Sequence, residues 1–363
     1  MTTSSPACVT GSCIRRDKSI AAIEFTCVSH SRLVIAIRPR HRTLAMDQQP
    51  FETYVRHGLT PFFRLPPADA ARLGHDIYAG CDAALLGVPY DSGTTYRSGA
   101  RLASYHIRRV SALVAGFHPI HRIDVFDQLA ARDCGNVMAP PFNAAAMREL
   151  VNAEIAAVLD AGATPFVIGG DHSVSLPVLR ALAKHHGPVA LVHVDAHFDC
   201  STAEGWGEKF HHGTPIRNAI EEGLLAEGKV VQIGLRGPWS ASSDGDLAEA
   251  FGGMRLTADE LANVGATNAA KRIVELVGDA PTYISIDIDA VDPAFAPGTG
   301  TPIPGGLTAR ELLGLLRGLA GVQLCGFDLV EVTPMLDHAD VTCLLAAHAL
   351  FEGLALAAIA RAA

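Results

Sequence analysis

The sequence has few charged residues, no paired cysteines and no long apolar run, and these shortages narrow the class of protein. Only 18% of the 363 residues are charged, and 49% are hydrophobic. That balance is typical of a well-packed globule and argues against a disordered chain. None of the eight cysteines belongs to a CxxC pair. Single cysteines inside apolar segments, such as Cys325, are usually buried and reduced, so we expect a reducing compartment, the cytoplasm.

The short apolar runs and the net charge indicate which partners to expect. The longest apolar runs have the length of a strand and are interrupted by glycine, proline or charge, so we expect no membrane span. The net charge is −9, which argues against nucleic acid as the main partner. An acidic protein suits a cationic ligand, although ordinary solubility accounts for the charge equally well.

The first 45 residues differ from the rest of the chain. They contain seven Lys or Arg and two Asp or Glu, which gives a charge of +5 there and −14 in the remainder. Such a basic, Ser-rich segment fits a transit peptide, a disordered arm, or a translation start assigned too early, with Met46 as the true start. We favour the last two, because we find neither a cleavage site nor an apolar signal core. Residues 46–363 show no repeat and no linker, so we expect a single domain there.

Apolar, β-branched stretches alternate with helical patterns after residue 80. The predicted strands are 83–88, 122–126, 165–168, 189–194, 230–234, 283–288 and 323–330. The predicted helices are 102–115, 143–161, one that ends near 186, 215–222, 268–277, 309–319 and 341–358. This alternation predicts an α/β protein, a three-layer α/β/α domain whose mostly parallel central sheet is covered on both faces.

Acidic and histidine side chains follow three of these strands. The clusters are Gly170-Asp-His172, Asp195-Ala-His-Phe-Asp199 and Asp287-Ile-Asp289. Residues two apart in an extended chain point to the same side, and ligands bind at the carboxyl ends of parallel strands. A lone Asp-x-Asp is most often a cap or a loop feature. A calcium loop from Asp287 fails, because its twelfth position is Gly298 rather than Glu. Three clusters together favour one shared site.

Apart from Asp171, the clusters offer four Asp and two His side chains. An oxygen-rich set with imidazole suits Mn²⁺, and Ni²⁺, Co²⁺ or Zn²⁺ fits the same ligands, whereas sulfur-preferring sites would use Cys. Six side chains are too many for one tetrahedral zinc but suit two metal ions bridged by carboxylates. With two divalent ions and a bridging hydroxide the site would keep a net charge of −1, matched to a cationic substrate.

These residues resemble the three signature motifs of the ureohydrolases, the family of arginase and agmatinase. The matching segments are Gly169–Ser173, Asp195–Asp199 and Ser285–Pro293, and the similarity runs from about residue 60 to the C-terminus. The resemblance implies an arginase-like catalytic domain, assembly as a trimer or hexamer, and two Mn²⁺ per subunit. It also implies the ligands: His172 and Asp199 for one ion, His197 and Asp289 for the other, and Asp195 and Asp287 for both.

The resemblance also implies a reaction. A hydroxide between the ions attacks the guanidinium carbon, and the tetrahedral intermediate breaks down to urea and an amine. His212 would shuttle a proton, and Glu331 would pair with the substrate guanidinium, since a fork of N–H donors binds a carboxylate strongly. We interpret His211 as a loop residue, Asp328 as a structural acid and Asp292 as an anchor of the loop that follows it.

Three further segments are similar to the agmatinase branch, which includes guanidinobutyrase and guanidinopropionase. They are residues 207–217, 296–302 and 328–334, and residues 200–207 lack the Asn/Ser-rich pattern with which arginase holds an α-amino acid. We therefore expect hydrolysis of agmatine to putrescine and urea. The alternatives are hydrolysis of a guanidino acid (guanidinobutyrate or guanidinopropionate), less favoured arginase or guanidine hydrolase activity, and a non-enzymatic regulatory subunit of the same fold.

The far end of the substrate, its tail, distinguishes these guanidines. A tail amine would need an acid such as Asp91 or Glu204. A tail carboxylate would need Arg97 or Arg217, although both arginines could instead form salt bridges within their loops.

Overall fold

The computed structural model describes residues 61–66, 77–239 and 241–362. The predicted basic extension, residues 1–45, lies outside these ranges, and so does the predicted boundary at Met46.

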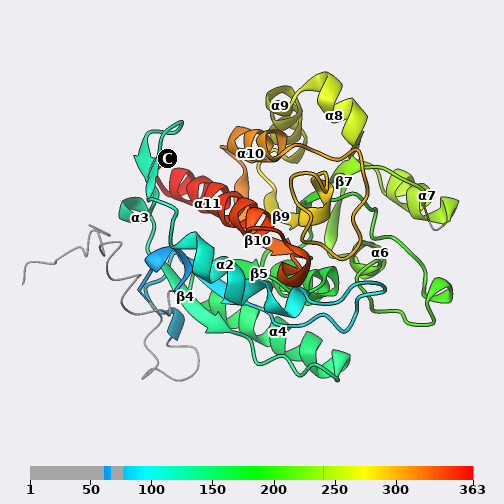
Figure 1. Cartoon of the computed structure of the whole chain (residues 1–363), viewed down its shortest axis with the longest axis horizontal. Helices are drawn as coiled ribbons and strands as arrows, with labels where there is room; N and C mark the ends of the chain where they lie inside the picture. Colours follow the sequence, from blue (N-terminus) through cyan, green and yellow to red (C-terminus); the bar gives the residue numbers. More distant parts are fainter. Residues whose placement is uncertain (1–60, 67–76, 240, 363) are drawn as a thin grey trace, which may run out of the picture. The chain divides into compact units, whose positions relative to one another are not determined.

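Eight strands form one parallel sheet in the order β4-β1-β5-β10-β9-β6-β7-β8. Figure 1 labels β4, β5, β10, β9 and β7 of this sheet. They are β1 (Ala83–Gly87), β4 (Ala131–Asn136), β5 (Thr164–Ile168), β6 (Val189–Val194), β7 (Leu225–Leu235), β8 (Met254–Thr257), β9 (Pro281–Asp287) and β10 (Gln323–Val330). Two short strands, β2 (Phe117–His118) and β3 (Ile123–Asp124), form a separate antiparallel pair.

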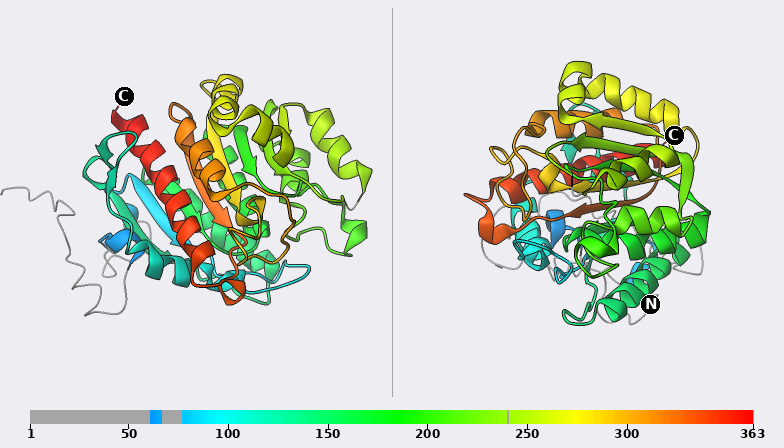
Figure 2. Two further views of the ribbon diagram at one scale, coloured as in Figure 1. Left: turned by 45° about the horizontal axis from the view of Figure 1, so that its top comes forward. Right: turned by 90° about the vertical axis from the view of Figure 1, so that its right-hand side faces the viewer.

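Alternate side chains of each strand pack on opposite faces of the sheet, as the two-residue period requires. In β5, Phe166 and Ile168 belong to one hydrophobic cluster and Val167 to the other. The first cluster is covered by α2 (Ala103–Ser111), α3 (Val125–Gln128), α8 (Ala258–Val264), α9 (Ala266–Val277), α10 (Ala309–Gly318) and α11 (Val341–Ala362). The second is covered by α4 (Ala144–Asp160), α5 (Ser175–His186), α6 (Pro215–Glu221) and α7 (Ser242–Phe251). Helices lie above and below the strands in the right-hand view of Figure 2, which confirms the predicted three-layer α/β/α fold.

Helix α11 is the most apolar helix of the first layer. Among the helices in the described part of the chain, it alone is long and apolar enough to cross a membrane, with a mean hydropathy of 1.9 over its most apolar stretch. However, 78% of that stretch is buried inside the protein. Its one buried acid, Glu352, is paired with His118 and Arg317 at 2.9 and 2.7 Å. Packing in the core therefore accounts for the composition of α11.

The structure corrects the predicted strand at 122–126. β3 spans only Ile123–Asp124, and α3 begins next, because the Asp124 side chain accepts a hydrogen bond from the N–H of Phe126 at 3.2 Å. The chain then adds β4 to the edge of the sheet. β4 contains no β-branched residue, so its sequence lacked the strand signal. The edge elements α7, β8 and α8 were also missed, whereas the predicted cap at Asn143 is confirmed.

The order of the strands brings the polar clusters together. β5, β10, β9 and β6 are neighbours in the middle of the sheet and run in the same direction. The residues that follow their carboxyl ends must therefore meet at one edge.

Candidate metal centre

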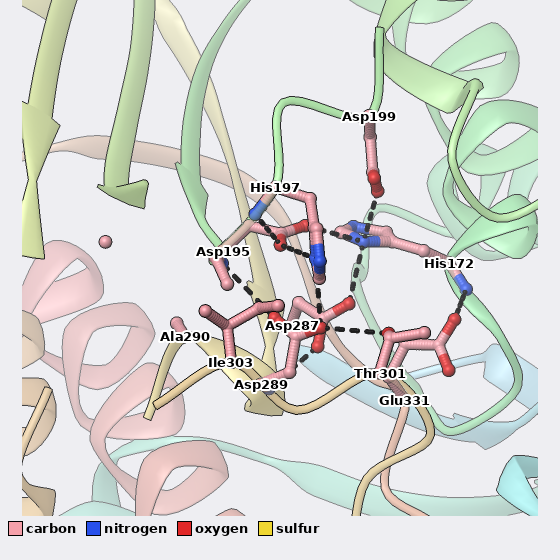
Figure 3. A network of polar contacts seen from close by, with 12 residues as sticks. His172, Asp195, His197, Asp199, Asp287, Asp289, Ala290, Thr301, Ile303 and Glu331 are labelled. Atoms are coloured by element: carbon pink, nitrogen blue, oxygen red, sulfur yellow. Dashed lines mark hydrogen bonds and ion pairs between the residues drawn. The ribbon is translucent and has the colours of Figure 1, made fainter. Parts of the chain in front are cut away.

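The six predicted metal ligands lie together at this edge, with their side chains pointing toward one another (Figure 3). His172 opens a 3₁₀ turn after β5, and Asp195, His197 and Asp199 lie in the loop after β6. Asp287 ends β9, and Asp289 lies in the 3₁₀ turn that follows. Five of the six are almost fully buried, and His197 is partly exposed.

Two groups of ligand atoms share Asp195. His172 Nδ1 lies 2.8 Å from Asp199 Oδ2, 3.1 Å from Asp195 Oδ2 and 3.2 Å from Asp287 Oδ2. His197 Nδ1 lies 3.1 Å from Asp289 Oδ2 and 3.3 Å from Asp195 Oδ1. The two oxygens of Asp195 thus face different histidines, which is the arrangement of a carboxylate that bridges two ions. Only one oxygen of Asp287 faces this cluster, because the other accepts the N–H of Asp289 at 2.8 Å.

The chemistry of this cluster fits bound cations. Asp195 Oδ2 and His172 Nδ1 are buried and make no hydrogen bond within the described ranges, which is costly unless a bound ion contacts both atoms. Burial, with the charges of Asp289 and Asp195, raises the pKa of Asp287 well above its ordinary value. A carboxyl group at this buried, negatively charged position must bind either a proton or a metal ion. The cluster therefore fits divalent cations.

The backbone is strained at two residues of the site. Asp199 and Glu331 have φ angles of 52° and 61°, in the left-handed region that residues other than glycine rarely adopt. Such strain persists only where the surrounding structure holds it, and it is concentrated at functional sites. In Glu331 the backbone N–H donates to Gly170 O at 3.0 Å, which ties the end of β10 to the loop that carries His172.

Glu331 and His212 form a buried pair beside the metal ligands. Glu331 Oε1 accepts the N–H of His172 at 2.9 Å and lies 2.9 Å from His212 Nδ1, while Oε2 is buried without a hydrogen-bond partner. Burial disfavours the charged form of His212, but the carboxylate of Glu331 outweighs it and raises the pKa of His212 to about 9. The pair therefore offers an open carboxylate oxygen and a protonated imidazole, whose Nε2 lies 2.7 Å from Thr95 Oγ1.

A third histidine, His193, was missed by the sequence analysis. Its Nε2 lies 2.9 Å from Asp195 Oδ2, and its Nδ1 lies 3.2 Å from Gln232 Nε2. The same Gln232 nitrogen donates to Phe198 O at 2.9 Å, so it is an N–H donor, and His193 Nδ1 accepts from it. The Nε2–H of His193 then faces Asp195 Oδ2 at ion-pair distance, so His193 holds the bridging carboxylate in place rather than binding metal. His193 precedes Asp195 by two residues, and this spacing could have revealed it.

The four residues considered for the substrate tail do not form a tail site. Asp91 is paired with Arg101 and accepts the N–H of Gly99 at 2.7 Å, and Glu204 is exposed. Arg97 is exposed and lies over the ring of Tyr96. Arg217 donates to Cys200 O at 2.6 Å and to Ser201 O at 3.0 Å, in keeping with a role inside its loop.

The neighbouring acids have the structural roles expected of them. Asp292 accepts hydrogen bonds from the N–H groups of Ala294, Gly305 and Gly306, which anchors the loop after β9. Asp328 is buried and accepts from the hydroxyl groups of Ser175 and Tyr283. His211 accepts the N–H of Gly213 at 3.1 Å within its own loop.

The chain is similar to known proteins of one family. The model of the arginase family matches residues 81–355. The chain is 42% identical over 291 residues to proclavaminate amidinohydrolase of Streptomyces clavuligerus, covering 80% of this chain and 91% of that protein. A solved structure of proclavaminate amidinohydrolase from the same organism has a TM-score of 0.77 and 41% identity, over 84% of this chain and 98% of that one.

Two further relatives are similar at nearly the same level. Mitochondrial agmatinase of Gallus gallus is 39% identical over 319 residues, 87% of this chain and 92% of that protein. Guanidinobutyrase of Pseudomonas aeruginosa is 40% identical over 299 residues, 81% of this chain and 91% of that protein. The family match and these relatives, all named as enzymes, support a hydrolase rather than the non-enzymatic alternative. The chain belongs to the arginase family and is a hydrolase of guanidino compounds, with a cluster of His and Asp side chains that fits a binuclear metal site.

Proposed function

We propose that this protein hydrolyses agmatine to putrescine and urea with two Mn²⁺ bound by the six clustered side chains. The observation that carries the proposal is the charge of the cavity beside the cluster. Arg236 is the only Arg or Lys among the described residues that line it. Its guanidinium donates to the backbone oxygens of Gly234, Ala290 and Ile303, each at about 3 Å, and to that of Asp289 at 2.6 Å. A carboxylate tail would meet no uncommitted Arg or Lys there, whereas a cationic substrate meets acids.

The metal assignment follows from the donor atoms. His172 and Asp199 would hold one ion, His197 and Asp289 the other, and Asp195 both, with Asp287 beside His172. Oxygen-rich ligation with imidazole favours Mn²⁺ and also accepts Ni²⁺, Co²⁺ or Zn²⁺. When bound, two such ions would supply a water of lowered pKa close to the substrate carbon.

The side chains of this protein would position the guanidinium and move the proton. Glu331 Oε2 has no hydrogen-bond partner among the described residues, so it can accept N–H groups from the substrate in a charge-assisted contact. His212 is held by Glu331 through Nδ1, which leaves Nε2, beside the hydroxyl and backbone N–H of Thr95, as the nitrogen that can exchange a proton. Because the departing amine must gain a proton, His212 is the group best placed to deliver it.

Urea release from a panel of guanidines tests the proposal. The panel contains agmatine, 4-guanidinobutyrate, 3-guanidinopropionate, arginine and free guanidine, each assayed with Mn²⁺-loaded protein. We expect the highest kcat/KM with agmatine. A protein that releases urea from the other guanidines but not from agmatine would refute the assigned substrate and leave the hydrolase chemistry intact.

A guanidino acid is the second candidate substrate. Its support is that guanidinobutyrase is as similar to this chain as agmatinase is, at 40% and 39% identity. Against it, Arg217 is committed to backbone oxygens, and Arg97 does not line the cavity. We also propose a cytoplasmic homo-oligomer, a trimer or hexamer, which light scattering of the purified protein would measure.

A further inference from the structure

A carboxylate outside the metal cluster also lines the cavity. Asp244 lies in the first turn of α7, which follows β7, the neighbour of β6 in the sheet. It lines the same cavity as His197, Asp199 and Asp287, so a ligand in that cavity can meet both the metal ligands and Asp244. No residue of the signature motifs belongs to α7.

Asp244 is buried, and the described residues supply no cationic partner for it. The residue is 5% exposed, and its Oδ2 accepts one hydrogen bond, from Ser201 Oγ at 3.4 Å. Within the described ranges no Lys, Arg or His forms an ion pair with it. Arg217, whose guanidinium reaches the neighbouring Ser243 O at 3.5 Å, forms its ion pair with Glu221 instead. A buried carboxylate without a cation is costly, so this position fits a positive charge that the substrate brings.

The other charged groups of the cavity are already committed. The Arg236 guanidinium is surrounded by backbone oxygens, and His212 is paired with Glu331. Burial, with the charge of His212, lowers the pKa of His211 to about 4, so His211 is neutral at pH 7. Outside the metal cluster, Asp244 is thus the charged lining residue without a partner of opposite charge in the described part of the chain.

Two indole rings line the same cavity as this carboxylate. Trp206 and Trp239 are 60% and 55% exposed, unusual for residues of this size. The ring of Phe198 meets Trp239 edge to face at 4.8 Å, and a side chain at Gly245 would come within 2.8 Å of the Trp239 ring. Gly245 therefore gives Trp239 room next to Asp244. Indole faces attract ammonium groups and also pack against methylene chains.

We propose that Asp244, with Trp206 and Trp239, binds the ammonium group at the tail of the substrate. The inference rests on the proposed function, and it assigns the specificity to one carboxylate. The substrates it selects are guanidines that carry a second amine at the far end of a short methylene chain. Asp244 acts on the tail rather than on the reacting carbon, so its effect appears mainly in KM.

The test compares Asp244→Asn with Asp246→Asn, a matched control on the exposed side of the same helix. Loss of one charge-assisted contact predicts a kcat/KM for agmatine about 10 to 100 times lower in the Asp244 variant. We expect that loss to lie mostly in KM, with Mn²⁺ content and kcat/KM for 4-guanidinobutyrate preserved. Asp246→Asn should match the wild type, and Asp244→Glu should recover part of the activity. Inhibition by putrescine, which needs no chemical step, should weaken in Asp244→Asn by a similar factor.

The outcomes separate the two proposals. If the wild type cleaves agmatine and Asp244→Asn does so equally well, or loses all guanidines to the same extent, the tail site is wrong and the function stands. If the wild type cleaves guanidino acids but not agmatine, both the proposed substrate and the tail site are wrong.

Discussion

Replacing Glu331 with Gln removes one charge and keeps the shape of the side chain. In the wild type, Oε1 is occupied by His172 N–H and His212, and Oε2 is open. If the amide oxygen keeps the place of Oε1, an NH₂ group replaces Oε2 and faces the N–H donors of the guanidinium. The variant loses a charge-assisted hydrogen bond, which contributes about 1.5–3 kcal/mol to binding. It also places two N–H donors against each other, which costs about 1–3 kcal/mol more. Because about 1.4 kcal/mol corresponds to a tenfold change in rate, we expect kcat/KM to fall by about 10²–10⁴.

The assay is urea release from agmatine by Glu331→Gln and wild type at matched Mn²⁺ content. Metal content should be unchanged, because Glu331 contacts His172 only through its backbone N–H. The pKa of His212 should also fall, since the Glu331 carboxylate is what outweighs burial, and the pH profile of kcat should shift accordingly. A variant within about fivefold of the wild type, or one that loses its metal, would refute the assignment of Glu331 to the substrate.

The remaining predictions separate metal binding from proton transfer. Asp195→Ala should abolish activity and lower Mn²⁺ content, because its two oxygens face both histidines. His212→Ala should lower kcat by about 10²–10⁴ and keep the metal, which metal analysis of both variants would check; equal metal loss would contradict the separation. Mn²⁺ affinity should rise with pH. In the metal-free protein, burial opposes protonation of His197, but Asp289 and Asp195 outweigh it and raise its pKa to about 12. Metal must displace that proton, so affinity should increase by up to about tenfold per pH unit for each proton released, and an affinity independent of pH between 6.5 and 8.5 would contradict this.

Most of the fold could be read from the sequence because its central strands are buried on both faces. β6 and β10 are mostly apolar, and the structure gives them the predicted bounds, Val189–Val194 and Gln323–Val330. The edges of the sheet gave weaker signals. β4 has no β-branched residue and lies at one edge, and β8 has only four residues at the other. An edge strand depends on its single neighbour more than on its own pattern, so local sequence marks it poorly.

Part of the candidate site could likewise be predicted from the sequence, and part could not. Asp195, His197 and Asp199 are spaced by two, and the expectation of an extended segment was enough to place them on one side, although the structure holds them in a loop with Asp199 in the left-handed region. His193 follows the same spacing and could have been included. Asp244 could not have been predicted, because it lies in a helix at the edge of the sheet, 45 residues after Asp199, and reaches the cavity only through the pairing of β7 with β6.

The central claim is that one chain holds two metal ions that are needed to hydrolyse agmatine. The most direct test titrates metal-free protein with Mn²⁺ while urea release from agmatine is recorded. We predict that activity appears with metal and reaches its maximum at two equivalents per chain. Binding of less than one equivalent, or no urea release at any Mn²⁺ concentration, would contradict it.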